Sequence, residues 1–330
     1  MRILIIGGAG MLGRKLAERL SRDGLLGQTE IRHVSLVDIV EPAPPAGGPL
    51  EIEARTVDLA DAGAAADLIS DRPDVVFHLA AVLSGEAEAD FEKGYRVNLD
   101  GTRHLFEAIR AMGDDYCPRV VFASSIAIFG APFPDVIGDE FCTSPLTSYG
   151  TQKAMCELLL ADYTRRGYLD GIGLRLPTIS VRPGTPNLAA SGFFSSIIRE
   201  PLNGEPAVLP VSDQIRHWHA SPRSAVGFLL HAATLDSRAL GDRRSVTMPG
   251  VSVTVAEQLE ALRSVAGDGV VALIRREPDD TIARIVGGWP HAFDARRARE
   301  LGFHAESSFE EIIRVHVEDE LGGRIPAVSA

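Results

Sequence analysis

A tyrosine and a lysine stand four residues apart in the stretch Tyr149-Gly-Thr-Gln-Lys153. On a helix this spacing puts both side chains on one face. A free tyrosine has a pKa of about 10, so about one in a thousand is phenolate near pH 7, and a neighbouring ammonium favours that charged form. The pair therefore has the chemistry of a general base. The same spacing also fits two solvated residues on a helix face. The surrounding elements must therefore decide between a catalytic pair and a solvated one.

The amino terminus predicts a strand, a glycine turn and a helix. The apolar run Arg2–Ile6 is followed by Gly7-Gly-Ala-Gly-Met-Leu-Gly13 and then by leucines at helical spacing. Gly7 permits a tight turn, Gly10 lets backbone amides approach a pyrophosphate, and Gly13 allows close helix packing. An ordinary turn is the alternative interpretation of these glycines. In this context we expect them to bind a dinucleotide.

The next two predicted strands each end at an aspartate. The strand 34–37 leads to Asp38, where a dinucleotide-binding fold places the acid that accepts hydrogen bonds from the adenosine ribose. A carboxylate there would repel a 2′-phosphate, so we expect NAD rather than NADP; a solvated strand end is the alternative. The strand 50–57 leads to Asp58, which has two compatible interpretations: contact with the adenine amino group, and the cap of a helix over 60–70.

Strands and helices alternate through the first half of the chain. Strands are predicted at 74–79, 119–123 and 171–176, with helical stretches at 91–112 and around Tyr149. This order favours an α/β fold, a Rossmann-type doubly wound parallel sheet whose ligands bind at the carboxyl ends of the strands. Six residues fall at such ends: Gly7, Asp38, Asp58, Ala80, Ser125 and Thr178.

Small side chains at the end of the strand 74–79 suggest a space for the cofactor, and an amide side chain further along suggests a structural brace. Ala80 and Ala81 follow the strand 74–79 and leave room for a ligand. Asn98 lies in the helical stretch 91–112, where a buried amide needs partners, so we expect it to brace the structure rather than to do chemistry.

The regular alternation loosens beyond residue 178. We expect an NAD-binding Rossmann domain over 1–178, with a return strand near 244–248, and a smaller, partly interleaved C-terminal domain over 179–330 that mainly binds substrate. Substrate contacts are expected around 182–187, in the Phe193-Phe194 segment and around 216–219. The region after about residue 250, which includes a helical stretch at 309–320, carries no chemistry that we recognise.

Composition restricts the classes of partner. The chain has 330 residues, 45% of them hydrophobic, and a formal net charge of -12, which disfavours nonspecific binding to nucleic acid or anionic membranes. No apolar run approaches the roughly twenty residues that span a bilayer, and the first strand follows Met1 directly, so we expect a cytoplasmic protein with a small-molecule partner. The cysteines lack ligand spacing and are expected to be reduced thiols without metal: Cys117, Cys142 and Cys156.

An ordered set of motifs resembles the extended short-chain dehydrogenases/reductases, the NAD-dependent epimerase/dehydratase family. The motifs are Gly7-Gly-Ala-Gly-Met-Leu-Gly13, His78-Leu-Ala-Ala81, Ser124-Ser-Ile-Ala-Ile-Phe-Gly130, Tyr149-Gly-Thr-Gln-Lys153 and Arg175-Leu-Pro177. The resemblance covers at least residues 1–250. It implies a serine four residues before an aromatic-glycine pair, which is Ser125 rather than Ser124. Phe129 stands where many relatives have tyrosine, and this departure removes a hydroxyl contact.

The resemblance implies a mechanism and a set of cofactor contacts. Tyr149 would remove the proton of a substrate hydroxyl while hydride leaves the same carbon for the nicotinamide. Lys153 would bind the nicotinamide ribose and lower the pKa of Tyr149, and Ser125 would hold the substrate oxygen, although a strand-end cap is its alternative role. The expected cofactor contacts are Gly7, Gly10, Met11, Leu12, Asp38, Asp58, Leu59, Ala80, Ala81, Asn98, Tyr149, Lys153, Pro177 and Thr178.

A narrower likeness points to NAD-dependent oxidation of the C2 hydroxyl of a four-carbon aldonate. It rests on segments 81–88, 176–187 and 215–220. The substrate carboxylate needs a cation, for which Arg offers a bidentate match. The candidates are Arg182 and Arg216, and Ser84, His217 and His219 could read hydroxyls. For Arg216 a surface ion pair, and for each histidine a packed or solvated position, is equally open. Two imidazoles without an acid cluster do not predict a metal.

Two other functions remain open. A nucleotide-sugar epimerase uses the same serine, tyrosine and lysine; a dehydratase commonly needs an acid beside the serine, and Ile126 and Ala127 disfavour it. A nonenzymatic NAD sensor would typically have lost the catalytic tyrosine and lysine, which are both present here as Tyr149 and Lys153. Relatives commonly form homodimers through two helices, so we expect a homodimer through 91–112 and 148–166.

Overall fold

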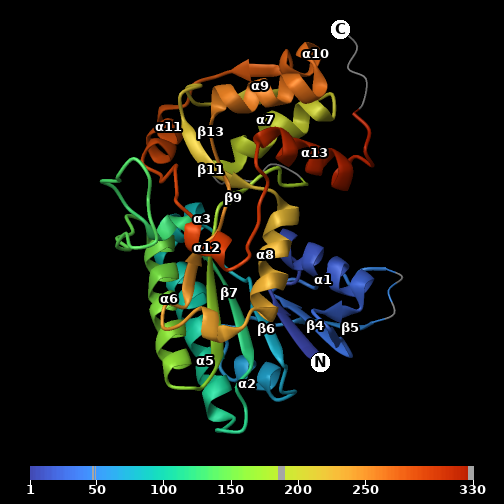
Figure 1. Ribbon diagram of the computed structural model, residues 1–330, viewed down its shortest axis with the longest axis vertical. Coiled ribbons are helices and arrows are strands. Elements are labelled where there is room, and N and C mark those ends of the chain that lie inside the picture. The colour runs from blue at the N-terminus through green and yellow to red at the C-terminus, as the bar shows by residue number, and fades with distance from the viewer. Residues whose placement is uncertain (47, 49, 185–189, 326–330) are drawn as a thin grey trace. The chain divides into compact units, whose positions relative to one another are not determined.

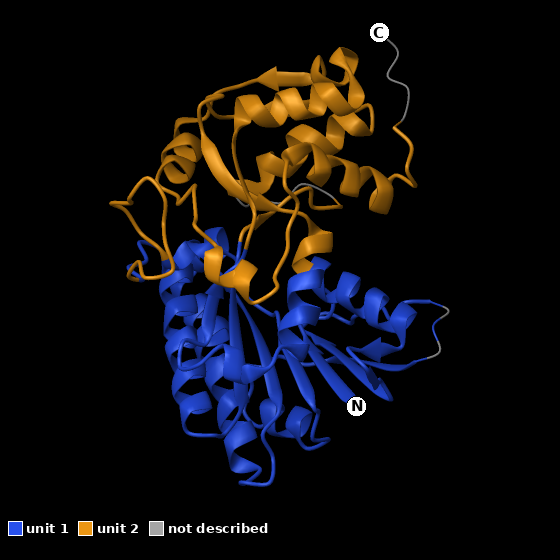
Figure 2. Cartoon of the chain, in the orientation of Figure 1, with its two compact units in different colours: residues 1–128, 143–176, 226–248 blue, residues 129–142, 177–225, 249–330 orange. Residues whose placement is uncertain are grey.

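A computed structural model describes residues 1–46, 48, 50–184 and 190–325. The chain forms two compact units, coloured separately in Figure 2. Unit 1 comprises residues 1–128, 143–176 and 226–248, and unit 2 comprises 129–142, 177–225 and 249–330. Compared with a single boundary at residue 178, the segment 129–142 therefore packs with unit 2 and the segment 226–248 packs with unit 1. Part of the expected substrate segment 182–187, residues 185–187, lies outside the described residues.

Unit 1 is built on a seven-stranded parallel sheet with the order β12-β8-β7-β6-β1-β4-β5. The order reverses at β1, as expected for a doubly wound sheet. Apart from the partly exposed edge strand β5, its strands are largely buried, which explains their Val, Ile and Leu runs. The strands are β1 (Arg2–Ile6), β4 (His33–Asp38), β5 (Glu51–Thr56), β6 (Val75–His78), β7 (Arg119–Ser125), β8 (Asp170–Leu176) and β12 (Ser245–Thr247).

Helices cover both faces of this sheet (Figure 1). On one face α2, α5 and α6 pack through Leu68, Phe106 and Leu160 onto strand residues such as Val76 and Phe122. On the other, α1 buries Leu16 and Leu20. The helices are α1 (Met11–Asp23), α2 (Ala64–Ile69), α3 (Ser84–Ala89), α4 (Phe91–Gly94), a π-helix η1 (Tyr95–Asp100), α5 (Gly101–Ala111), a 3₁₀ turn η2 (Ile126–Ile128) and α6 (Ser148–Arg165).

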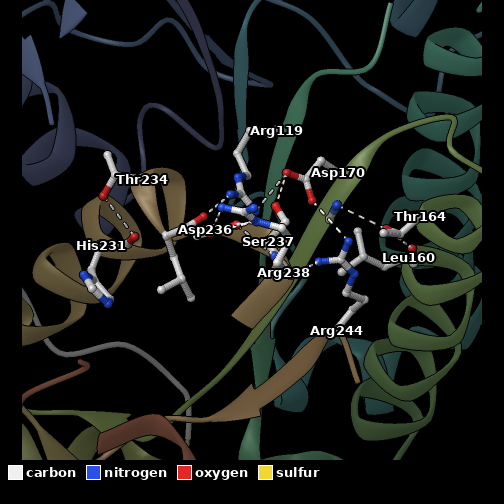
Figure 3. A network of polar contacts seen from close by, with 12 residues as sticks. Arg119, Leu160, Thr164, Asp170, His231, Thr234, Asp236, Ser237, Arg238 and Arg244 are labelled. Carbon is white, nitrogen blue, oxygen red and sulfur yellow. Dashed lines mark hydrogen bonds and ion pairs between the residues drawn. The ribbon is translucent and has the colours of Figure 1, made fainter. Parts of the chain in front are cut away.

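The returning segment 226–248 is tied to the sheet at the amino ends of β7 and β8 (Figure 3). Asp170 accepts from Ser237 and forms ion pairs with Arg119, at 3.2 Å, and with Arg244, at 3.3 Å. The segment contains the last part of α8 (Pro222–Thr234), the 3₁₀ turn η4 (Ser237–Ala239) and β12. It supplies the return strand that the sequence predicts near 244–248. A two-stranded hairpin, β2 (Leu25–Leu26) with β3 (Thr29–Glu30), completes the strands of unit 1.

Unit 2 combines short strands with helices around its own apolar core, to which Phe194, Val255, Leu262 and Ile313 contribute. The strand order β13-β11-β9 forms one sheet and β10 pairs with β14. The strands are β9 (Thr178–Ile179), β10 (Ala207–Leu209), β11 (Arg216–Ala220), β13 (Val251–Thr254) and β14 (Ile274–Arg276). The helices are η3 (Ala190–Gly192), α7 (Phe193–Leu202), α9 (Val255–Ala266), α10 (Asp268–Val271), α11 (Asp280–Gly287), α12 (Arg296–Glu300) and α13 (Phe309–Glu320).

Within the described part of the chain, no helix has the length and apolar character needed to cross a membrane. Within the same residues, no group of three or more His, Cys, Asp or Glu side chains is placed to hold a metal ion. The cysteines are free thiols, with Cys117 and Cys142 exposed and Cys156 buried.

Candidate active site

The glycine turn between β1 and α1 is packed so tightly that side chains cannot replace two of its hydrogens. Gly7 has a φ of 96°, and a Cβ there would lie 2.6 Å from the backbone nitrogen of Ala80. At Gly13 a Cβ would lie 2.2 Å from the carbonyl oxygen of Gly7. Gly10 differs, since its closest neighbour would be that same oxygen at 3.3 Å. Gly7 and Gly13 are therefore required by the protein itself, whereas Gly10 leaves the turn open on its outer side.

The first turn of α1 is suited to an anion. Gly10 is its N-cap and offers no side-chain cap, and the turn carries no acidic residue. The N–H groups at Met11 and Leu12 thus begin the helix without a side-chain acceptor from the cap. A helix N-terminus of this kind favours a phosphate through its free donors and its dipole.

Asp38 at the end of β4 faces the glycine turn. One carboxylate oxygen accepts from the backbone nitrogen of Ala9 at 3.0 Å, and the other accepts from that of Ile39 at 2.8 Å. These two bonds fix the carboxylate and leave further lone pairs on both oxygens. The position and the spare acceptor capacity are those needed to bind ribose hydroxyls.

Asp58 has local partners at the end of β5. Its carboxylate accepts from the backbone nitrogen of Ala60 at 2.9 Å and pairs with Arg96 at 2.9 Å. The helix expected over 60–70 begins later, as α2 at Ala64, because Gly63 adopts a left-handed conformation and becomes its N-cap. Asp58 therefore caps the turn before the helix, which corrects the expected cap of the helix itself. Leu59 is buried beside it.

The loop after β6 is held by Asn98. The side-chain oxygen of Asn98 accepts from the backbone nitrogen of Val82 at 2.8 Å, and its amide donates to the oxygen of the same residue at 3.0 Å. The amide also donates to Gln152 on α6 at 2.7 Å. Asn98 thus braces the loop that follows Ala80 and Ala81, as the sequence predicts. Ser84 is half-buried at the first position of α3.

The expected bracing helix is not a continuous α-helix. The stretch 91–112 contains α4, the π-helix η1 and then α5. The π-helix carries Asn98, whose carbonyl oxygen accepts from Thr102 at 2.6 Å and from the thiol of Cys156 at 3.2 Å. A π turn inserts one extra residue into the helical repeat, which an apolar periodicity does not reveal. Such turns are frequent at functional sites.

Tyr149, Ser125 and Lys153 come together in unit 1. Helix α6 begins at Ser148 because the Thr147 side chain accepts from the backbone nitrogen of Gly150. The Tyr149 side chain hydrogen-bonds Ser125 at the end of β7. One turn later, Lys153 is 2% exposed and donates to the carbonyl oxygen of Ala123 at 2.8 Å. Its ammonium lies 5.7 Å from the centroid of the Tyr149 ring.

Burial dominates the proton affinities of this pair. It raises the pKa of Tyr149 to about 12, although the hydrogen bond with Ser125 acts in the opposite direction. Burial also lowers the pKa of Lys153 to about 8, against the neighbouring Cys156 and Glu157, which raise it. The pKa of Tyr149 is therefore raised in the protein alone, in contrast to the expected lowering by Lys153, because desolvation of the phenolate is the largest cause. Near pH 7 the phenol is protonated and the lysine is mostly charged.

Three neighbours of this cluster were not predicted from the sequence. His78 is buried beside Phe122, contacts Thr102 at 2.8 Å, and has its pKa lowered to about 3 by burial and by the charge of Lys153. Gln152 contacts Asn98, and Glu157 contacts Ser124 at 2.5 Å. Gln152 could have been noted as a polar residue next to Lys153, whereas Glu157 gave no such signal because its partner Arg175 lies 18 positions later on another element.

In unit 2 a polar cluster includes three of the predicted residues, Thr178, His217 and His219. Thr178 contacts the ring nitrogen Nε2 of His217 at 2.6 Å, and Ser180 contacts His219 at 3.1 Å. Both histidines are buried, and the ring of His217 stacks on Phe194 with centroids 5.1 Å apart. Burial lowers the pKa of His217 to about 3 and that of His219 well below its ordinary value. Both are neutral packed residues near pH 7. Pro177, before Thr178, is also buried.

The two candidate arginines differ in burial. The guanidinium of Arg182 donates to the backbone and side-chain oxygens of Ser191, at 3.0 and 3.2 Å, and burial together with Arg199 lowers its pKa. Arg216 is partly exposed; it donates to the carbonyl oxygen of Ser252 at 2.9 Å and pairs with Glu257 at 3.2 Å. Each already has protein partners, so an anion would share the donors of either guanidinium with them.

The residues of unit 1 fit a dinucleotide. The turn is closely packed at Gly7 and Gly13, where neighbouring backbone atoms leave no room for a Cβ. The uncapped start of α1 suits the pyrophosphate, Asp38 suits the adenosine ribose, and Lys153 would lie at the nicotinamide end.

Several known proteins are similar to this chain over nearly its whole length. The model of the NAD dependent epimerase/dehydratase family matches residues 3–234. A D-erythronate dehydrogenase of Cupriavidus necator is 48% identical over 97% of this chain and 98% of its own length. A D-erythronate dehydrogenase of Haemophilus influenzae is 42% identical over 96% and 99%.

A solved structure described as the nucleoside-diphosphate-sugar epimerase from Agrobacterium tumefaciens is also similar. It superposes with a TM-score of 0.97 at 63% identity, and the match covers 99% of this chain and 96% of that one. The fold of that protein, including the α/β architecture expected here, is thus shared over nearly the whole length.

Proposed function

This chain belongs to the NAD dependent epimerase/dehydratase family and is an NAD-dependent dehydrogenase that acts on a CH–OH group, and from this premise we propose that it oxidises the C2 hydroxyl of D-erythronate to give 2-dehydro-D-erythronate. The observation that carries the proposal is the hydrogen bond between Tyr149 and Ser125 beside a buried Lys153. The name of two relatives aligned over nearly their full length supports the choice of substrate.

The reaction needs a base at the substrate hydroxyl. Tyr149 takes its proton, and Ser125 holds the same oxygen by a hydrogen bond. When bound, NAD supplies the hydride acceptor and a positive charge that favours the phenolate. Lys153 adds a second positive charge, since its ammonium is buried and held by Ala123 rather than by a carboxylate in direct contact. These charges offset the burial that otherwise keeps Tyr149 protonated.

Different residues would contact the different parts of the cofactor. We propose that Gly10, Met11 and Leu12 bind the pyrophosphate through their backbone and that Asp38 binds the adenosine ribose. Asp58 and Leu59 would border the adenine. Nearer the reacting atoms the contacts would come from Ala80, Ala81, Asn98, Tyr149, Lys153, Pro177 and Thr178, with Asn98 acting through the loop that it braces.

The carboxylate of the aldonate requires a cation outside this set. We propose Arg216 and Arg182 for this role, and Ser84 and His217 for the remaining hydroxyls. Arg216 is partly exposed and has donors to share with an anion. His217 is neutral, so it would recognise a hydroxyl rather than the carboxylate.

The proposal includes a cytoplasmic homodimer. The outer surface of α6 carries Leu158, which is 71% exposed, and Phe91 at the start of α4 is 59% exposed. Large apolar side chains at such exposures favour association with a second copy of the chain. Light scattering of the wild type and of Leu158→Glu tests this, with a dimer expected for the first and a monomer for the second.

One other function has a specific observation in its favour. A nucleotide-sugar epimerase would use the same Ser125, Tyr149 and Lys153, and the solved structure at 63% identity is described as such an enzyme. An epimerase would give no net NADH. A dehydratase remains disfavoured, because Ile126 and Ala127 follow Ser125 where an acid is commonly needed.

The test is NADH formation from NAD with D-erythronate, L-threonate, longer aldonates and several nucleotide sugars, with Tyr149→Phe as the blank. Turnover confined to D-erythronate supports the proposal. Silence toward every acid, together with conversion of a nucleotide sugar without net NADH, would replace it with the epimerase.

A further inference from the structure

Glu157 is a buried acid that the mechanism above does not use. It lies on α6, four residues after Lys153 and eight after Tyr149, and is 6% exposed. Residues at this spacing share one face of a helix. The face of α6 that carries the reacting tyrosine therefore also carries a carboxylate inside the protein. A buried carboxylate is costly unless it is paired and hydrogen-bonded.

The partners of Glu157 come from two adjacent strands. Ser124 Oγ at the end of β7 donates to Oε1 at 2.5 Å. From β8, Arg175 Nε lies 3.1 Å from both carboxylate oxygens and its terminal nitrogen donates to Oε2 at 2.8 Å. Ser124 and Arg175 are opposite each other in the β7–β8 register. One carboxylate thus joins α6 to both strands, directly beside Ser125.

The same carboxylate is the acid closest in sequence to Lys153 on its helix. Two neighbours on α6 favour the charge of this ammonium, first Cys156 and then Glu157, and His78 on β6 lies within its field. Tyr149 is the fourth neighbour, with its ring 5.7 Å from the ammonium. Arg175 pairs with Glu157 at 2.8 Å and neutralises it in part. Without Glu157, burial would lower the pKa of Lys153 further, because one of the groups that raise this pKa would be gone.

We propose that Glu157, clamped by Arg175 and Ser124, is a positioning residue for the reaction: it keeps Lys153 charged and holds α6 in register with the end of β7, where Ser125 meets Tyr149. The inference rests on the proposed function only for its effect on turnover. Its electrostatic part concerns Lys153 itself and can be measured without substrate.

The sequence makes a direct measurement practical, because its lysines are Lys15, Lys93 and Lys153. Protein labelled with ¹³C at the lysine ε-carbon would give few NMR signals. The signal that is missing in Lys153→Met is that of Lys153. We would follow that signal against pH in wild type and in the double variant Glu157→Gln/Arg175→Met, which removes both charges and leaves no buried guanidinium without its partner. Glu157→Gln alone is the second variant. The matched control is Asp162→Asn, the same change on an exposed part of α6.

The expected midpoint for Lys153 in wild type is about 8. In the double variant it should fall by a fraction of a pH unit, while Asp162→Asn leaves it unchanged. In turnover assays the ratio of kcat at pH 8.5 to kcat at pH 7 should fall for the Glu157 variants, with KM for NAD within about twofold of wild type.

A Lys153 midpoint that stays at the wild-type value in a folded Glu157 variant would overturn the proposal, as would a loss of kcat that is equal at all pH values. If the double variant does not fold, judged by circular dichroism, Glu157→Gln decides by the same criterion. Should no aldonate be turned over by the wild type, the NMR result still stands, so failure of the proposed function is distinguishable from failure of this inference.

Discussion

Helix α6 in unit 1 and strand β11 in unit 2 both place polar side chains in the interior, and they satisfy them differently. On α6 the interior groups include charges, with Lys153 held by a carbonyl and Glu157 by an arginine. On β11, His217 and His219 are neutral, contacted by the hydroxyls of Thr178 and Ser180 and surrounded by aromatic rings. A buried charge retains electrostatic energy that a reaction can use. Neutral imidazoles provide shape and hydrogen bonds.

This difference implies that changes to the buried charged face of α6 should act on turnover and changes to the buried histidines of β11 on stability. The sharpest test is Tyr149→Phe. We expect kcat to fall about 100- to 10,000-fold, because a general base contributes on that scale, while the affinity for NAD stays within about twofold. NADH formation and NAD-induced fluorescence quenching measure the two quantities. Retained turnover would show that Tyr149 is not the base.

The glycine turn separates cofactor binding from stability within unit 1. In Gly13→Ala the new Cβ would lie 2.2 Å from the Gly7 carbonyl oxygen, so we expect a loss of about 1–3 kcal/mol of unfolding free energy. Gly10→Ala meets only that oxygen, at 3.3 Å, and should remain close to wild type in stability while binding NAD more weakly. Urea unfolding and NAD titration of both variants check this. Equal stabilities for the two would contradict the packing argument.

The neutral histidines predict a pH dependence of stability. The folded pKa of His217 is about 3, below the ordinary value of 6.5. Between these values the unfolded chain binds a proton that the folded chain does not, so stability is complete above about pH 6.5 and is lost as pH falls. In His217→Phe the free energy of unfolding should depend less steeply on pH than in wild type between pH 7.5 and 5, which urea unfolding at several pH values measures. The control is His304→Asn, an exposed histidine in the same unit, whose slope should match wild type.

The smallest expected effect concerns Arg216. Its ion pair with Glu257 is partly exposed, and such pairs contribute about 0–1 kcal/mol, so Arg216→Ala should leave the melting temperature nearly unchanged. If it binds the substrate carboxylate, KM for D-erythronate should rise about tenfold or more at constant kcat. An unchanged KM would remove Arg216 from the substrate site and leave Arg182 as the candidate.

Strand ends were the most predictable part of the molecule. The positions of Gly7, Asp38 and Tyr149 follow from local patterns: an apolar run that ends at a polar or glycine residue, and a four-residue spacing on a helix. These patterns depend on nearest neighbours in sequence, so a single chain reveals them. The parallel sheet with helices on both faces confirms the predicted fold class.

Features that depend on distant residues were not predictable in the same way. The π-helix around Asn98 shifts the helical repeat by one residue, which periodicity averages out. Glu157 depends on Arg175, a residue 18 positions later on a different element. On β11 the alternation of Arg216, His217, Trp218 and His219 does not show which face is covered, and the structure buries both histidines and the tryptophan.

The place of β12 in the sheet affects how the chain folds while it is being synthesised. β8 ends at Leu176, yet the strand that pairs with its open side begins at Ser245. While the protein emerges from the ribosome, β8 must therefore remain an unpaired sheet edge until about seventy further residues have been translated. Unpaired edges invite association with other nascent chains. A truncation before residue 245 would make that transient edge permanent, so such fragments should aggregate rather than accumulate as a smaller folded enzyme.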